Sequence, residues 1–187
     1  APGDSQVFLD GNPVPLLYHF GGLTSFFNSQ LLESITFVPG NFSVRYGRKI
    51  GGILEVEPRD PRTDGYHGFV EVSVIDASLS LEGPIGDNFA FAVAFRRSLI
   101  DLVLGAVAQN ADLQFLTAPV YYDYQAIATW RPDDENRFRL LVYGATDQLR
   151  LLTNTDASDD QTSTSGSFGF EQQFHRFQLS WRHLYGD

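Results

Sequence analysis

Hydrophobic and polar residues alternate one by one along much of the chain from Tyr66 onward, and this alternation predicts β-strands. A strand points successive side chains to opposite faces of a sheet, so a period of two indicates one apolar and one polar face. The apolar positions of four such segments are Phe89, Phe91, Val93 and Phe95; Tyr122, Tyr124, Ala126, Ala128 and Trp130; Phe138, Leu140 and Val142; and Phe177, Leu179 and Trp181.

Two more strands are predicted before these four. The alternation that includes Val70 and Val72 changes phase before Leu79 and Leu81. A change of phase within one strand would need a β-bulge, and a tight hairpin around Ile75-Asp76 explains it as well. We favour the hairpin, which gives six strands, all antiparallel if each follows the last directly.

The connections between these strands differ in length. Residues 83–88 and 131–136 form short turns, whereas residues 98–119 and 152–173 form long links. Short turns at one end and long loops at the other are typical of outer-membrane barrels, which have their short turns in the periplasm. The short first hairpin departs from this pattern, and a soluble β-sandwich would also show alternation.

The two tryptophans give a second indication of a membrane barrel. If the short turns are periplasmic, Trp130 and Trp181 lie near the same membrane–water interface, where amphipathic rings are favoured. The alternative is that both are ordinary core residues. Plugged barrels have about 22 strands, and an open sheet would leave backbone groups unpaired in lipid. A membrane barrel therefore requires strands beyond the six predicted.

Residues 1–62 have a different character, because they are rich in glycine and proline and predict a small α+β domain. Strands are expected at Val7–Leu9, Ile35–Val38 and Gly52–Val56, with a short helix near Phe26–Leu32. Residues 58–62 read as a linker, because proline cannot continue a central strand. The predicted division is therefore residues 1–62 and residues 63–187.

The amino-acid composition argues against several classes of function. A net charge of -10 argues against nucleic-acid binding, since phosphate recognition needs clustered Lys and Arg. The lack of cysteine excludes disulfides and thiolate metal ligands. No run reaches the roughly 18 apolar residues of a transmembrane helix, and residues 99–108 predict only a short helix in an extracellular loop. No signal peptide is visible, which fits a start downstream of one.

Catalytic and metal-binding motifs are not apparent. The four histidines lack metal-ligand spacing, and neither a nucleophile elbow nor a phosphate-binding loop occurs. The cluster of Asp156, Asp159 and Asp160 is a calcium candidate without EF-hand spacing, and a solvated loop is the preferred interpretation. We therefore expect no enzymatic activity, no cofactor and no metal site.

The stretch from Val7 to Pro61 resembles the second half of the plug domain of TonB-dependent receptors. VFLDGNPV at 7–14 is similar to the family's VxVDGVPV, LESITFVPG at 32–40 to IERIEVLRG, NFSVRYG at 41–47 to PxSxxYG, and GGILEV at 51–56 to GGVINI. LSLEGPIGDNF at 79–89 resembles the family's early-barrel turn. Each segment alone is an ordinary turn pattern, whereas their order and spacing together are specific. The matching motif residues are Asp10, Gly11, Gly40, Ser43, Tyr46, Gly47, Gly51 and Gly52.

The resemblance implies a mainly β fold. Residues 1–62 would be the C-terminal part of the plug, a small α+β segment, and residues 63–187 would be the antiparallel N-terminal strands of a transmembrane β-barrel. One departure is Pro39, because the family usually has an arginine there that in many members pairs with carboxylates on the barrel wall. Arg45 and Arg48 are the candidate replacements.

By the same resemblance, the chain belongs to a transporter in the outer membrane of a Gram-negative bacterium. Its implied partners are outer-membrane lipid, TonB through a box upstream of Ala1, and a small extracellular ligand such as a siderophore, cobalamin, glycan or peptide. Tyr18, His19 and Phe20 are the candidate ligand contacts at the plug apex, since exposed aromatic residues often anchor ligands. Structural packing is an equal alternative for Phe20. The rival hypothesis is a soluble β-rich binding or adhesion module with an N-terminal α+β cap.

Overall fold

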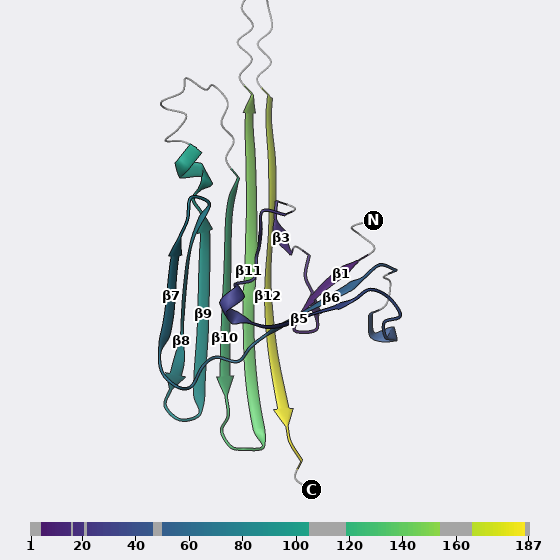
Figure 1. The fold of residues 1–187 in the computed structure, drawn as a ribbon, viewed down its shortest axis with the longest axis vertical. Coiled ribbons are helices and arrows are strands. Elements are labelled where there is room, and N and C mark those ends of the chain that lie inside the picture. Colours follow the sequence, from purple (N-terminus) through teal and green to yellow (C-terminus); the bar gives the residue numbers. More distant parts are fainter. Residues whose placement is uncertain are drawn as a thin grey trace, which may run out of the picture.

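The computed structural model describes residues 5–15, 17–20, 22–46, 50–104, 119–153 and 166–185. Six long strands lie side by side in one tall sheet, which we call the wall (Figure 1). A four-stranded sheet and a small hairpin lie on one face of the wall, and we call this part, residues 5–58, the plug segment.

Each strand of the wall pairs with its neighbours in the chain, and every pairing is antiparallel. The strands are β7 (His67–Val72), β8 (Asp76–Ile85), β9 (Phe89–Ser98), β10 (Val120–Trp130), β11 (Asn136–Thr153) and β12 (Gly166–His183). The six antiparallel strands predicted from the sequence are therefore confirmed. The favoured hairpin is confirmed too, because residues 73–75 join β7 to β8.

The two short turns are confirmed at residues 86–88 and 131–135, and they define the lower end of the wall. The predicted link at residues 152–173 was wrong in extent, because β11 and β12 remain paired up to Thr153 and Gly166 and rise above the other strands (Figure 1). Residues 154–165, with the aspartate cluster, lie outside the described residues. In the other predicted long link, residues 100–104 are helical.

The plug segment is built on a mixed sheet in the order β2-β1-β6-β5, in which β1 and β6 are parallel. Its strands are β1 (Gln6–Leu9), β2 (Asn12–Pro13), β5 (Leu32–Val38) and β6 (Ile53–Pro58), beside a hairpin of β3 (Tyr18–His19) and β4 (Thr24–Ser25). The predicted helix was wrong in extent, since only the 3-10 turn η2 (Ser29–Leu31) forms, capped by Asn28. A second 3-10 turn, η3 (Val44–Tyr46), follows β5.

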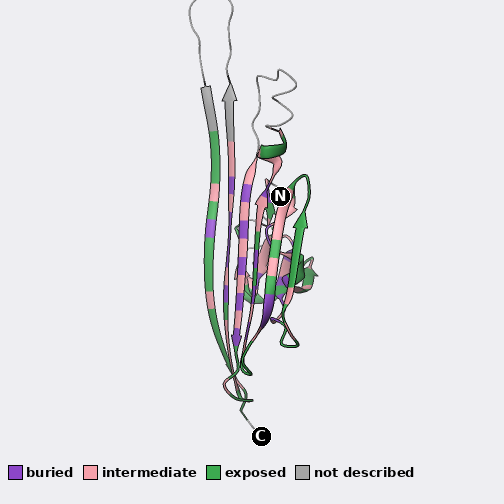
Figure 2. Ribbon diagram, turned by 90° about the vertical axis from the view of Figure 1, so that its left-hand side faces the viewer, coloured by how far each residue is buried: buried purple, intermediate pink, exposed green. Residues whose placement is uncertain are grey.

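The hydrophobic core lies between the plug segment and the wall. Its members from the plug segment are Leu9, Val14, Phe26, Phe27, Leu31 and Val56, and those from the wall are Ala92, Ala94, Ile127, Leu141, Tyr143, Ala145 and Phe174. Buried and less buried residues alternate along the wall strands (Figure 2). Within the described ranges, no helix is both long and apolar enough to cross a membrane.

Candidate functional site

The wall has two faces of different chemistry. The inward face touches the plug segment through the polar side chains Arg96, Asp123, Gln125, Arg139, Asp147 and Gln178, and it touches the linker after the plug segment through Glu82. The outward face carries exposed apolar side chains, among them Leu79, Leu81, Phe95, Trp130, Leu140, Phe177, Leu179 and Trp181. The aromatic side of the strands therefore points away from the plug segment.

The outward apolar residues form a belt with distinct ends. At the lower end, Trp130, Phe138 and Trp181 occupy paired positions and stack, with ring centroids 5.2 and 6.0 Å apart. At the upper end, the Arg97 guanidinium lies 5.7 Å from the Tyr122 ring centroid. Arg97 lies eight positions after Phe89 along β9. For a strand that rises roughly 3.3 Å per residue at a tilt of about 40°, this spacing corresponds to about 20 Å of depth. This is close to the apolar band of membrane barrels, about 25 Å tall.

The three candidate ligand residues lie at the β3–β4 hairpin and point in different directions. Tyr18 is exposed over 46% of its surface, whereas His19 is completely buried against the wall. Phe20 has a positive φ of 48°, and its backbone N–H donates to Asp147 Oδ2 at 3.0 Å. Of the three, only Tyr18 presents an exposed aromatic ring, and His19 contacts the wall.

His19 is the centre of a buried charged cluster. Its Nδ1 bonds to Asp147 of β11, and its Nε2 lies 3.1 Å from Asp123 Oδ2 of β10. The imidazole stacks on Tyr121 with centroids 4.3 Å apart, and Arg96 Nε donates to Asp123 Oδ2 at 2.7 Å. Burial by itself would lower the pKa of His19, but the hydrogen bonds to Asp123 and Asp147 outweigh burial and raise that pKa above its usual value.

The hairpin itself is also attached to the wall beside this cluster. Arg96 Nη1 donates to Thr24 Oγ1 at 3.0 Å, and Arg96 Nη2 donates to the Ser25 carbonyl. Gln125 Nε2 donates to the Phe26 carbonyl at 2.7 Å. The apex of the plug segment is thus held by side chains from β9, β10 and β11.

A second contact layer is formed by the turn between β1 and β2. Asp10 and Gly11 have positive φ of 50° and 77°, as a type I′ turn requires. Asp10 Oδ1 accepts a hydrogen bond from Arg139 Nη1 at 3.0 Å, and its Oδ2 accepts one from Gln178 Nε2 at 2.8 Å. Asn12 Nδ2 donates to Gln178 Oε1 at 2.6 Å. This turn therefore docks on β11 and β12.

The linker from β6 to β7 is tied to the wall by ion pairs. The Arg59 guanidinium donates to both oxygens of Glu82 on β8, at 2.7 and 2.6 Å. Asp60 pairs with Arg131 at 2.9 Å and also with Arg137. Because Glu82 is buried and the contact is bidentate, this is a strong type of charge-assisted bond.

The other motif residues organise the plug segment internally. Tyr46 Oη donates to Glu55, and Gly52 leaves room for the ring of Phe37, which lies 2.5 Å from where a Cβ would stand. Ser43 closes the η3 turn by accepting from Tyr46 N through its carbonyl at 3.0 Å. Gly40 precedes this turn and Gly51 precedes β6, while Gly47 and Arg48 lie outside the described residues.

Arg45 does not take the place of the family's arginine. Its guanidinium lies over the Tyr46 ring, with 5.7 Å to the centroid, and beside Gly11. Both contacts are within the plug segment. The ion pairs to the wall come instead from His19, Arg59, Asp10 and Asp60.

Asp123 and Asp147 are the site residues that sequence reasoning missed. Asp123 stood at a polar position of a predicted strand, and alternation identified it only as part of a polar face. Asp147 lay between the last alternating position named on its strand, Val142, and the predicted link at residues 152–173, and no role was predicted for it. A signal was present for Asp123, because a carboxylate on the plug-facing side of a strand must find a partner once buried.

The fold and this interface define one class of structure: part of a plugged membrane β-barrel, with the plug on the polar face of the strands. Solved structures with this fold include the ferric enterobactin receptor PfeA from Pseudomonas aeruginosa, with 15% identity, a TM-score of 0.59, and cover of 99% of this chain and 31% of that chain. They also include the siderophore receptor PirA from Acinetobacter baumannii, with 16% identity, a TM-score of 0.55, and cover of 80% of this chain and 24% of that chain.

The chain thus spans about a quarter to a third of the length of these receptors. At these identities the likeness concerns the fold, and it confirms the predicted fold class: a small α+β plug part followed by antiparallel strands of a partial barrel. No protein-family model and no curated protein matches the sequence.

Proposed function

We propose that this chain is part of a TonB-dependent transporter in the outer membrane of a Gram-negative bacterium. Residues 1–62 serve as the C-terminal part of the plug, and residues 63–187 serve as the first strands of the barrel. TonB engages a segment upstream of this part, and the transporter imports a scarce extracellular ligand. The observation that carries this proposal is the wall itself, whose polar face binds the plug segment while its aromatic face points away.

The rival soluble module fits this arrangement less well. A sandwich buries its apolar face against a second sheet, and here the plug segment packs on the opposite face. Phe177 and Leu179 are each 75% exposed on the outward side. A contiguous exposed apolar surface of this kind is typical of contact with lipid or another protein.

The edges of the wall also favour a larger barrel. Within the described residues, β7 and β12 each have a partner on one side only. Unpaired backbone groups in lipid cost several kcal/mol each, so strands in a membrane form closed barrels. Further strands must therefore pair with both edges.

The class of ligand is proposed from the solved structures with this fold and from the residues of the β3–β4 hairpin. The solved structures with this fold are named as a ferric enterobactin receptor and a siderophore receptor, so a ferric siderophore is the first candidate, with Tyr18 as the contact residue. Cobalamin, a glycan or a peptide are the other outcomes to test.

Uptake measurements with the full-length protein test this function. The protein would be expressed in a strain that lacks its own siderophore receptors, and accumulation of labelled iron would be followed with a panel of ferric siderophores. We expect uptake of at least one of them that is lost in a matched strain without TonB. Binding without TonB-dependent uptake of any candidate ligand, or recovery of the full-length protein in the soluble fraction, would contradict the proposal.

A further inference from the structure

The geometry around His19 determines its protonation state. Both ring nitrogens face carboxylate oxygens, Asp147 at Nδ1 and Asp123 at Nε2. An ionised carboxylate only accepts hydrogen bonds, whereas a neutral imidazole has one donor and one acceptor nitrogen. With both carboxylates ionised, both contacts require the doubly protonated imidazolium.

We propose that His19 is a proton-dependent latch: its imidazolium ties the β3–β4 apex hairpin to both β10 and β11, and loss of the proton opens the contact to Asp123 of β10 and loosens the hairpin. Tyr18 and Phe20 flank His19, so the latch sets the position of the candidate ligand residue. The proposal rests on the proposed function only in assigning the hairpin to the ligand side of the plug.

The other groups around His19 do not replace its charge. Tyr121 covers the ring face and donates its hydroxyl proton to Asp76 Oδ2 at 2.8 Å. From β9, Arg96 donates to Asp123 Oδ2, the same oxygen that His19 Nε2 faces, and also binds the hairpin through Thr24 and Ser25. Asp123 accepts a further bond from Gln125 at 3.2 Å, and Asp147 accepts the Phe20 N–H.

These partners decide which bond is lost. After deprotonation, His19 keeps one N–H, and the other nitrogen turns a lone pair towards a carboxylate. Asp123 retains Arg96 as a charged partner, so the contact from Nε2 to Asp123 is the one that opens. The hairpin then stays attached through Asp147 and Arg96 but loses the hydrogen bond from His19 of β3 to Asp123 of β10.

The direction of the pH dependence follows from the raised pKa of His19. Where the folded-state pKa exceeds the unfolded value of about 6.5, the stabilisation is complete below that value and is lost as the pH rises through the folded-state pKa. The latch is therefore closed in mildly acidic solution and opens on the alkaline side.

A spin label on the hairpin reports this opening directly. Leu23 lies between β3 and β4 and is 43% exposed, so Leu23→Cys in the full-length protein in native membranes, with any other cysteine of that protein replaced by serine, provides a label site. We expect the nitroxide to be immobilised at pH 6 and its mobile fraction to rise in a one-proton titration with a midpoint above 6.5. His19→Gln, which cannot titrate, should abolish the transition, and His67→Gln, which changes an exposed histidine of β7, should leave it unchanged.

A flat mobility profile between pH 5.5 and 10 in the parent protein, or a titration that survives in His19→Gln, would overturn the latch. If His19→Gln fails to assemble, the Asp147→Asn variant provides the test. Removal of this carboxylate should lower the midpoint pH of the mobility titration, and an unchanged midpoint would overturn the proposal. No ligand or TonB is present in these measurements. A flat mobility profile would therefore contradict the latch and leave the transporter proposal standing. A normal spin-label titration together with no uptake of any ligand would contradict only the transporter proposal.

Discussion

Single charged residues hold the plug segment on the wall, and their arrangement differs from the one that the resemblance implied. The family places an arginine on the plug at the position of Pro39. Here, in the contact layer at the apex, the plug segment contributes the cation His19, which lies opposite the carboxylates of Asp123 and Asp147 on the wall. In the contact layer at the β1–β2 turn the charges are the other way round, because the plug segment contributes the carboxylate of Asp10 and the wall contributes Arg139. Pro39 carries no charge, and the plug segment and the wall are joined by these pairs instead.

The linker pair gives a residue-scale prediction. Glu82→Gln removes the charge that binds Arg59 and that also accepts the Arg62 N–H at 3.1 Å. Bonds to charged groups contribute about 1.5–3 kcal/mol, and we expect a loss of about 2 kcal/mol in the free energy of local opening. Hydrogen exchange of the linker amides in the full-length protein should accelerate by roughly thirtyfold.

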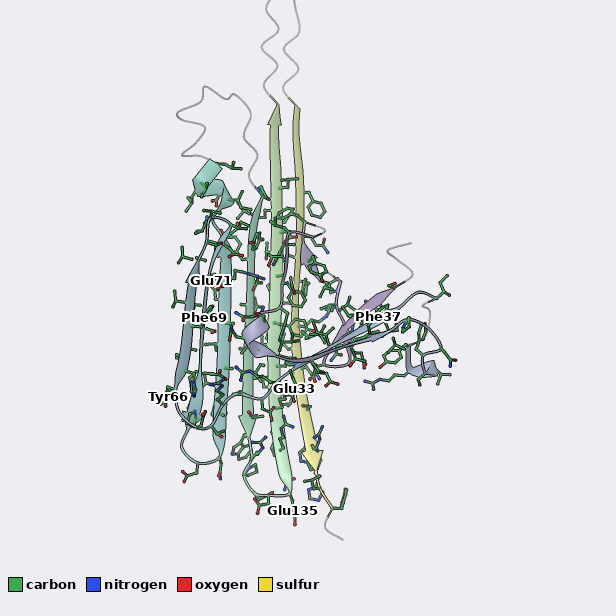
Figure 3. The ribbon with its side chains drawn as sticks, in the orientation of Figure 1. Glu33, Phe37, Tyr66, Phe69, Glu71 and Glu135 are labelled. Atoms are coloured by element: carbon green, nitrogen blue, oxygen red, sulfur yellow. The ribbon has the colours of Figure 1, made fainter. Side chains whose placement is uncertain are left out.

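Glu71→Gln is the matched control for this change. Glu71 lies on the same face of the sheet, on β7, and is exposed near the edge of the wall (Figure 3). It should leave exchange in the linker unaltered. Equal exchange rates in the two variants would show that the Arg59–Glu82 pair does not hold the linker.

At the scale of elements, β10, β11 and β12 interlock on the outward face around a glycine. Tyr124, Gly144 and His175 occupy paired positions on the three strands. The Tyr124 hydroxyl is 2.7 Å from His175 Nδ1 across the space above Gly144. Because Gly144 has no side chain, the rings of Tyr124 and His175 can meet over β11. This contact favours one register of the three strands.

Gly144→Ala should disturb this contact. A Cβ there would lie 2.7 Å from His175 Nδ1 and 2.8 Å from the Phe174 carbonyl oxygen, and the backbone atom cannot move aside cheaply. Overpacking of this kind costs about 1–3 kcal/mol, so we expect a lower urea midpoint for the full-length protein in detergent micelles. Gly169→Ala on β12 is the control, because its Cβ meets nothing closer than 4.0 Å. Indistinguishable midpoints would contradict the register role.

The elements that the sequence predicted well are those with one apolar face. Alternation placed β7 to β10 and the lower halves of β11 and β12 because their outward positions are mainly apolar and their inward positions mainly polar or small. Above Gly144 the outward positions become Thr146 and Gln148, while the inward positions still include Ala145 and Phe174, so the apolar outward pattern ended while the strands continued. The pairing of His19 with Asp123 and Asp147 joins residues more than 100 positions apart, and no local pattern carries that information.

At the scale of the whole molecule, one sheet separates two environments. The plug segment covers the inward face, and its charged contacts form layers from the apex to the linker. The outward belt ends in stacked aromatic rings below and in Arg97 and Tyr122 above. Aromatic rings and long cationic side chains are favoured at membrane interfaces, so the membrane placement that we propose puts the two ends of the belt at the two interfaces.

A spin-label scan of β8 tests this placement on a strand that has neighbours on both sides. Ser78 and Ser80 point inward, while Leu79 and Leu81 point outward and are 48% and 45% exposed. With single cysteines at these four positions of the full-length protein in lipid bilayers, collision with oxygen should be high at 79 and 81 and low at 78 and 80, since oxygen concentrates in the hydrocarbon region. A water-soluble nickel complex should not reach 79 or 81. If the labels at 79 and 81 instead met the nickel complex freely, or were immobilised in a protein core, the outward face would not be in lipid and the membrane orientation argued from the belt would be wrong.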